Sequence, residues 1–210
     1  MRRLRTGAAL RQRIKEGAAL LYRTVADAKF DLLNRVDTSG YIPPGELGIA
    51  PSGHAYQASP ERKIVSAIRS LPIEFRKFTF IDLGSGKGRV LVVAARFRFR
   101  QIIGVEISAA LCRVASENTR RFPNVSIVCG DAGGYRLPAG ACVVYLGNPF
   151  EAEVMAAVLG NVEERWKRDP SPIYLVYLVP ECRRLLDAAP FLRHISSPGH
   201  CPVYVTREDM

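Results

Sequence analysis

The sequence lacks the features of a membrane protein, an exported protein and a zinc protein. No apolar run in its 210 residues reaches the roughly 18 to 20 residues that a membrane-spanning helix needs. The N-terminus alternates arginines with small residues and shows no apolar core or cleavage site of a signal peptide. The five cysteines are scattered without a Cys-x-x-Cys pair, which argues against a zinc site and a disulfide framework. We therefore expect a soluble, cytoplasmic protein with free thiols.

Acidic residues are scarce, and the basic excess is concentrated near the N-terminus. The formal net charge is +10, and residues 1–36 contain nine basic and three acidic residues, a net +6. Apolar residues recur there at steps of three and four, which predicts an amphipathic helix that docks on the domain or on a second subunit. These residues are Leu10, Ile14, Ala18, Leu21, Val25, Ala28, Leu32 and Leu33. The basic face is either simply solvated or recruits nucleic acid, an acidic protein surface or anionic lipid.

Proline and glycine cluster in residues 37–59, which predicts a linker or lid without regular structure. Ser59-Pro60 then forms a good N-cap and first-turn pair for a helix over residues 61–71. We expect residues 1–59 to form a basic helical arm with this linker or lid, and residues 60–210 to form one catalytic domain.

Continuously apolar segments alternate with helical ones along that domain, which indicates a parallel sheet covered on both faces. We expect strands over 78–83, 101–106, 125–129, 141–146 and 173–179, with intervening helices near 88–97, 109–121 and 151–168. A short helix over 181–188 precedes two strands, 191–195 and 203–206, which are joined too tightly for a crossover. The predicted fold is α/β and doubly wound, with a mostly parallel seven-stranded sheet that ends in an antiparallel hairpin.

The segment Phe80-Ile81-Asp82-Leu83-Gly84-Ser85-Gly86-Lys87-Gly88-Arg89 carries three glycines between a strand and a helix. Glycine accepts positive φ and removes the Cβ that would collide with a ligand near the backbone. A phosphate-binding P-loop is excluded because its four-residue gap between glycines is absent. A dinucleotide fingerprint would need its third glycine where Arg89 stands.

The observed Gly-x-Gly-x-Gly, preceded by Asp82, resembles motif I of the class I S-adenosylmethionine-dependent methyltransferases. The resemblance implies a Rossmann-like fold and S-adenosyl-L-methionine as cofactor, with S-adenosyl-L-homocysteine as product. It also implies that the loop passes beneath the methionine part of the cofactor, with contacts from Asp82, Gly84, Ser85 and Gly86.

Two further acids follow successive strands, as in that family. Glu106 ends the second strand, and its two carboxylate oxygens suit the vicinal ribose hydroxyls of the cofactor, with Ile107 as the adjoining contact. After the third strand, Asp131 matches the family residue that accepts from the adenine amine, while the backbone amide of Ala132 meets the ring. Singly, each acid is also consistent with a solvated loop or a helix cap.

After the fourth strand, Gly147-Asn148-Pro149-Phe150 resembles the Asn/Asp-Pro-Pro-aromatic motif of enzymes that methylate amino groups. The resemblance implies that Asn148, Pro149 and Phe150 form the catalytic acceptor site and that Asn148 is also a cofactor contact. In it, Asn148 and the adjacent carbonyl accept hydrogen bonds from the target amine, and Phe150 stacks on its planar group. The second proline of the motif is missing here. The alternative is that Asn148 caps the next helix and Pro149 opens it. Glu151 and His54 are candidate bases for a protonated acceptor.

Upstream, the segment from His54 to Pro60 resembles the aromatic-x-x-Ser/Thr-Pro sequence that precedes motif I in seven-strand lysine methyltransferases. The resemblance implies that Tyr56 and Ser59 fold over the cofactor, with the Ser59 hydroxyl near its carboxylate. Turn packing and helix capping are the alternative roles of these two residues.

Together these motifs predict a methyltransferase that acts on a nitrogen of a protein lysine, an amide, a nucleobase or a small amine. The acceptor is a protein or a nucleic acid if the basic arm recruits it. Two other functions stay open at this point. One is a basic nucleic-acid-binding protein whose S-adenosylmethionine site is vestigial or regulatory, and the other is a nucleotide-dependent oxidoreductase.

Overall fold

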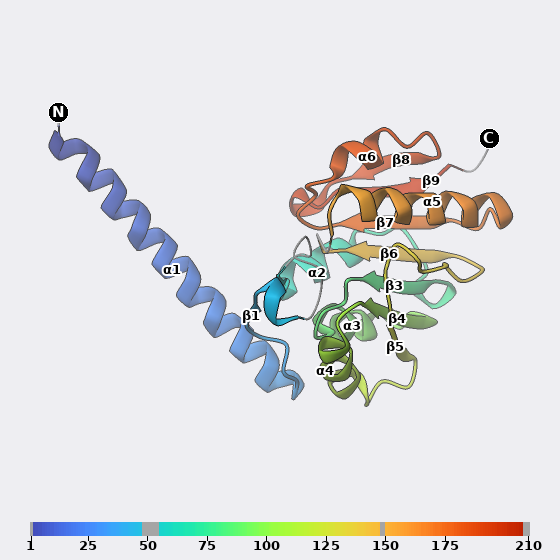
Figure 1. Cartoon of the computed structure of the whole chain (residues 1–210), viewed down its shortest axis with the longest axis horizontal. Helices are drawn as coiled ribbons and strands as arrows, with labels where there is room; N and C mark the ends of the chain where they lie inside the picture. The colour runs from blue at the N-terminus through green and yellow to red at the C-terminus, as the bar shows by residue number, and fades with distance from the viewer. Residues whose placement is uncertain (1, 48–54, 148–149, 208–210) are drawn as a thin grey trace.

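The computed structural model describes residues 2–47, 55–147 and 150–207, with side chains described from residue 17 onward apart from residue 19 (Figure 1). A seven-stranded sheet runs through the domain in the order β5-β4-β3-β6-β7-β9-β8. Its strands are β3 (Thr79–Leu83), β4 (Gln101–Glu106), β5 (Val125–Cys129), β6 (Cys142–Leu146), β7 (Ile173–Tyr177), β8 (Leu192–Ser196) and β9 (Val203–Thr206). The first five pair in parallel, whereas β9 pairs antiparallel with both β7 and β8. The predicted Rossmann-like α/β fold with a C-terminal antiparallel hairpin is confirmed.

The strand order reverses at β3, because the chain first adds β4 and β5 on one side of it and then β6 and β7 on the other. The carboxyl ends of β3, β4 and β6 therefore meet at one edge of the sheet. In register, Asp82 lies beside Gly104 of β4 and Tyr145 of β6. Ligands of open α/β sheets bind in the crevice at such a switch point.

Helices cover both faces of the sheet, as the apolar strands require. They are α2 (Glu61–Arg69), α3 (Arg89–Ala94), α4 (Ala109–Thr119), α5 (Ala152–Arg168) and α6 (Arg183–Asp187). Alternate residues of β3 face opposite sides: Phe80 packs in the cluster that includes α2 and α3, and Ile81 packs in the cluster that includes α5. The described part of the chain holds no helix that has both the length and the apolar character for crossing a membrane.

Short elements connect these layers and correct two expectations. The segment predicted to lack regular structure contains β1 (Tyr41–Ile42) and β2 (Tyr56–Gln57), which pair antiparallel, and the 3₁₀ helix η1 (Pro44–Glu46). Further 3₁₀ turns are η2 (Phe75–Lys77), η3 (Ala95–Phe97) and η4 (Pro198–His200). The N-cap of α2 is Pro60, so the prediction that Ser59 caps this helix is wrong. Pro60 has an extended backbone, and α2 begins directly after it. Ser59 therefore lies outside the helix and lines the pocket.

The N-terminal helix α1 (Arg2–Asn34) is continuous, and its first half extends away from the sheet (Figure 1). The predicted apolar stripe does not dock on the domain, because Leu21, Val25 and Leu32 are 67%, 60% and 79% exposed. A polar face docks in its place. The residues of this docked face are Arg23, Asp27, Phe30, Asp31 and Asn34.

A buried arginine explains this choice of face. Arg89, at the start of α3, is 3% exposed, contacts Asp27 and lies 3.4 Å from Asp31 of α1. Its Nε donates to Thr38 Oγ1 at 2.8 Å, and its guanidinium lies 4.5 Å from the centre of the Phe30 ring. Burial alone would raise the pKa of Asp31, but hydrogen bonds from Ser39 and Thr38 outweigh it and hold the pKa below the ordinary carboxyl value. A buried guanidinium needs carboxylate partners, and α1 turns its acidic face inward to supply them.

Replacing this arginine should destabilise the protein strongly. Arg89→Met leaves the two aspartates of α1 without their partner, and we expect the free energy of unfolding to fall by about 3 kcal/mol. Arg120→Met is the matched control: Arg120 is 76% exposed and pairs with Glu117 on the surface, so its loss should cost less than about 1 kcal/mol. Urea unfolding of the three proteins measures the difference, and equal losses in the two variants would contradict the role given to Arg89.

Candidate functional site

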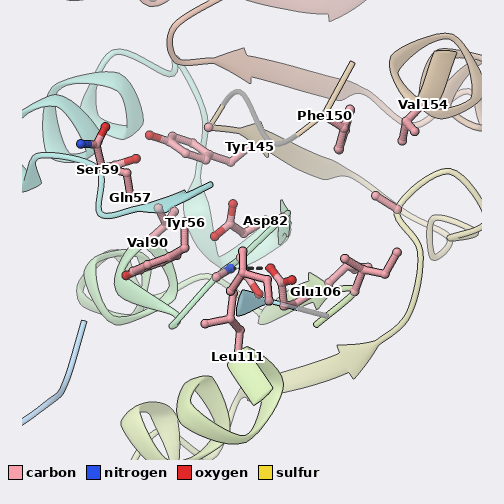
Figure 2. Close-up of a pocket in the computed structure, with 18 of the residues that line it drawn as sticks. Tyr56, Gln57, Ser59, Asp82, Val90, Glu106, Leu111, Tyr145, Phe150 and Val154 are labelled. Carbon is pink, nitrogen blue, oxygen red and sulfur yellow. Dashed lines mark hydrogen bonds between the residues drawn. The ribbon is translucent and has the colours of Figure 1, made fainter. Parts of the chain in front are cut away.

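A pocket opens at the switch point of the sheet, where the carboxyl ends of β3, β4 and β6 meet (Figure 2). The glycine loop forms its floor, and residues 55–59 and the loops after β4, β5 and β6 form its walls. Most of the predicted site residues line it: Tyr56, Ser59, Asp82, Gly84, Ser85, Gly86, Glu106, Ile107, Asp131, Ala132 and Phe150. Asn148, Pro149 and the candidate base His54 lie outside the described residues, whereas Glu151 is on the pocket wall.

The glycine loop needs glycine for both conformation and space. Gly84, Gly86 and Gly88 have φ values of 79°, 55° and 84°, in the left-handed region that other residues seldom adopt. A Cβ on Gly86 would lie 2.4 Å from the ring of Tyr56. The loop is anchored to β4, since the amides of Gly84 and Ser85 donate to the Val105 carbonyl at 2.8 and 3.0 Å. The loop therefore has a fixed position, with its backbone exposed to the pocket at Gly84 and the Tyr56 ring packed on Gly86.

Glu106 joins two loops of the site. Its Oε2 accepts from the amide of Gly86 at 2.8 Å, and its Oε1 accepts from the amide of Ser108 at 2.9 Å. The side chain is 7% exposed and points into the pocket (Figure 2). Each carboxylate oxygen has a second lone pair, so both can still accept a hydroxyl of a ligand. The sequence predicted only that Glu106 contacts the ligand. Its hydrogen bond to the Gly86 amide is an additional, structural role.

Asp82 is the most strongly perturbed acid of the pocket. It is 2% exposed, and its Oδ2 has no hydrogen-bond partner among the described residues. Burial raises the pKa of Asp82 well above the usual carboxyl value, and the nearby charge of Glu106 raises it further. A cationic amine placed beside this oxygen would offset both effects. The unpaired oxygen, aimed into the pocket, fits the amino group of a bound amino-acid moiety.

The opposite end of the pocket is more open. Asp131 is exposed, and its Oδ1 accepts from the amide of Gly133 at 3.0 Å, which orders the turn after β5. Ala132 is 9% exposed beside it, while Ile107 is 56% exposed after β4. Acceptor oxygens and apolar surface at this end are suited to a flat heterocycle with an amino group.

Tyr56 covers the glycine loop and connects it to the arm. Its ring lies against Gly86, and its hydroxyl donates to the Thr38 carbonyl at 2.5 Å. Lys87 Nζ lies 5.7 Å from the centre of this ring and 3.0 Å from Asp37 Oδ1. Burial raises the pKa of the Tyr56 hydroxyl, so this residue acts as a neutral donor. The wall of the pocket is thus fastened to the segment that follows α1.

The sequence analysis missed Tyr145, which ends in the same pocket (Figure 2). Its side chain is fully buried, and burial, followed by the charge of Asp82, raises the pKa of its hydroxyl well above the ordinary value. The signal in the sequence was a tyrosine two residues before the Gly147-to-Phe150 turn, in a strand that is otherwise aliphatic. No group of histidine, cysteine and acidic residues suited to a metal ion occurs in the part of the chain that the structure describes.

Comparisons with known proteins agree with this geometry. Residues 80–167 match a family model described as a methyltransferase domain. The structure of DhpI in complex with SAH has a TM-score of 0.52 at 12% identity, covering 70% of this chain and 84% of that chain. The ribosomal protein L11 methylase from Lactobacillus delbrueckii subsp. bulgaricus has a TM-score of 0.51 at 12% identity, covering 73% and 81%. The 23S rRNA methyltransferase ErmE has a TM-score of 0.50 at 14% identity, covering 70% and 67%. No curated protein matches the chain in sequence.

Asp82 gives opposite predictions for stability and for binding. Because its pKa is raised in the folded protein, the stability from its protonated form is present below the ordinary carboxyl pKa and is lost as pH rises through the raised value. Asp82→Asn should therefore make the ligand-free protein more stable at mildly alkaline pH. It should also weaken S-adenosylhomocysteine binding about tenfold to a hundredfold, through loss of a charged hydrogen bond worth about 1.5 to 3 kcal/mol.

Urea unfolding at mildly acidic and mildly alkaline pH, with calorimetric titration of S-adenosylhomocysteine, tests both effects. Asp187→Asn is the control, since a hydrogen bond from Tyr204 lowers the pKa of Asp187 on the surface and its replacement should not stabilise the protein. Asp82→Asn with unchanged affinity would contradict the assignment of the amine to this oxygen.

The site combines a glycine loop at the sheet's switch point, a buried acid at the end of each of two neighbouring strands and a third acid after the next strand. A dinucleotide site is disfavoured because Arg89 stands where its third glycine would pack. The family-model match covers the stretch from β3 to α5, which builds this pocket together with residues 47 and 55–59. Residues 80–167 thus match a methyltransferase domain, the fold is the Rossmann-like fold of its structural neighbours, and the site fits S-adenosylmethionine as cofactor.

Proposed function

We propose that the chain is an active methyltransferase that transfers a methyl group from S-adenosylmethionine to a nitrogen atom. The observation that carries this proposal is the position of the turn after β6. Phe150 of that turn is 9% exposed and lines the same pocket as Asp82 and Glu106, across from Tyr145 (Figure 2). An aromatic ring beside a cofactor pocket gives a planar acceptor group a surface on which to stack.

The cofactor would supply a methyl group already activated by a sulfonium centre, so the protein has mainly to position the partners and exclude water. We assign its amino group to Asp82, its ribose hydroxyls to Glu106, and its adenine to Asp131 and the amide of Ala132. Tyr56 and Ser59 would close the methionine end. Asp82 and Glu106 would bind the cofactor most strongly, because both acids are less than a tenth exposed.

The acceptor end follows from the Gly147-to-Phe150 turn. In the proposal, the Asn148 carboxamide and the neighbouring carbonyl accept the N–H bonds of the acceptor and aim its lone pair at the methyl group. When bound, the cofactor would supply the methyl group to the acceptor nitrogen, and the acceptor proton would leave to a carboxylate or to water. Glu151 and Glu153 line the pocket and are available for that proton. The N-cap of α5 is Glu151, so capping of α5 gives no competing reason for asparagine at 148.

The competing function is a nucleic-acid-binding protein whose cofactor site is vestigial or regulatory. The unpaired, buried Asp82 oxygen argues against a vestigial site, since a site without ligand has no reason to retain a destabilising acid. A regulatory site would bind S-adenosylhomocysteine but transfer no methyl group. If the arm recruits the acceptor, replacing Arg2, Arg3, Arg5, Arg11 and Arg13 by glutamine should impair methylation of a macromolecule while leaving S-adenosylhomocysteine binding intact.

Methyl transfer can be measured while the acceptor is still unidentified. Tritiated S-adenosylmethionine and the protein are added to a lysate of source cells that lack it, and the label is sorted by protease and nuclease sensitivity. We expect Asn148→Ala and Phe150→Ala to lower incorporation by on the order of a hundredfold, as misplacement of a reacting group does. Binding of S-adenosylhomocysteine should stay within about twofold, because neither change removes a proposed contact to the buried end of the cofactor.

Phe122→Ala is the control, since Phe122 is a half-buried aromatic residue that does not line the pocket. Its label incorporation should match that of the unaltered protein. Full incorporation by Phe150→Ala would refute the acceptor site, and label found only on oxygen or carbon would refute nitrogen as the target.

A further inference from the structure

The apolar stripe of α1 follows the seven-residue repeat of a coiled coil. Its members alternate at steps of four and three residues over nearly three repeats, which is the spacing of a narrow helix-to-helix seam. The seam consists of Ile14, Ala18, Leu21, Val25, Ala28 and Leu32. From Ala18 onward every one of these side chains is exposed. A soluble domain seldom leaves so long an apolar line uncovered.

The domain cannot cover this seam. Arg23, Asp27 and Phe30 of the docked face lie on the opposite side of α1, where Arg89 and Ala58 hold them. Rotating the helix to bury the seam would strand the Arg89 guanidinium without its carboxylates. The first half of α1 also extends beyond the domain, as Figure 1 shows, so a partner has to come from outside the protomer.

The order of residues in the seam is self-complementary when two copies run antiparallel. With the two-fold axis level with residue 23, Leu21 meets Val25 of the other copy, Ala18 meets Ala28, and Ile14 meets Leu32. Large residues thus face large ones and small face small, so the two helices stay at a constant distance. A two-fold interface needs this pairing of each residue with its counterpart in both directions.

Charge selects the antiparallel over the parallel arrangement. Five arginines lie between residues 2 and 13, and parallel helices would place both sets side by side. In the antiparallel register the two sets are at opposite ends. Residues 11–13 are then level with residues 33–35 of the other copy, at the C-terminal end of its α1, where the helix dipole offsets part of the repulsion from Arg35.

The chemistry of the seam also favours a second helix over an anionic surface. Membrane-surface helices carry a broad apolar face of large side chains, whereas alanine occupies two of the six seam positions here. Nucleic acids are bound through phosphate contacts and base edges, which do not need an apolar line. We infer that α1 pairs with α1 of a second copy of this chain, as an antiparallel coiled coil centred near residue 23.

The inference is independent of methyl transfer and is tested on the full chain by sedimentation velocity over a hundredfold concentration range. We expect a monomer–dimer equilibrium that shifts toward dimer as salt rises, because salt screens the repulsion between two chains that each carry a net charge of +10. Leu21→Glu with Val25→Glu should yield a monomer. Leu20→Glu is the matched control, since Leu20 is also 67% exposed but lies off the seam, and this variant should still dimerise.

A charge swap tests the register. Leu21→Lys with Val25→Glu places lysine opposite glutamate twice in the antiparallel dimer, so it should restore association, now weakened by salt. All variants should bind S-adenosylhomocysteine normally, because the seam does not touch the domain. The inference is overturned if the unaltered protein is monomeric throughout, if the charge swap is monomeric, or if seam variants lose only binding to anionic lipid vesicles or to RNA.

Discussion

The buried carboxylate of Glu106 organises the cofactor end of the molecule. It stays hydrogen-bonded to the amides of Gly86 and Ser108, and so fixes the glycine loop relative to the loop after β4. Its charge also contributes to the raised pKa of Asp82, whose oxygen has no partner among the described residues. Two acids so close cannot both be charged cheaply in a buried place. The pocket therefore gains most from a ligand that brings a positive charge to Asp82 and hydroxyl donors to Glu106.

A second buried charge, Arg89, determines how the arm is placed. It stands one residue after Gly88, which itself makes the close contact with α4, since a Cβ there would be 3.3 Å from the Cβ of Ala115. Because Gly88 makes the close contact, the Arg89 side chain can point away from the sheet and contact Asp27 of α1. The residue that separates this loop from a dinucleotide fingerprint is the same one that anchors the N-terminal helix. Arg89 therefore both disfavours a dinucleotide in the pocket and determines which face of α1 docks on the domain.

The sequence predicted what depends on local patterns. The strands, their parallel arrangement and the acids at their ends follow from apolar runs and from residues that stand next to them. For α1 the sequence left open whether the apolar stripe docks on the domain or on a second subunit. The face that docks on the domain could not be predicted, because it depends on a pairing between Asp27 and Arg89, 62 residues apart. Ser59 was expected to cap α2, but proline at the next position took that place. Tyr145 was missed because, in a strand buried on both faces, the pattern does not show which residue faces the pocket.

The two faces of α1 have a joint consequence. Pairing with Arg89 fixes the rotation of the helix about its own axis, and a helix fixed in rotation presents its other face in one direction. The apolar seam therefore points away from the domain as a result of the same ion pairs that brace the glycine loop. The segment that follows the helix is connected to the pocket wall, because the Thr38 and Ser39 carbonyls accept hydrogen bonds from Tyr56 and Lys87.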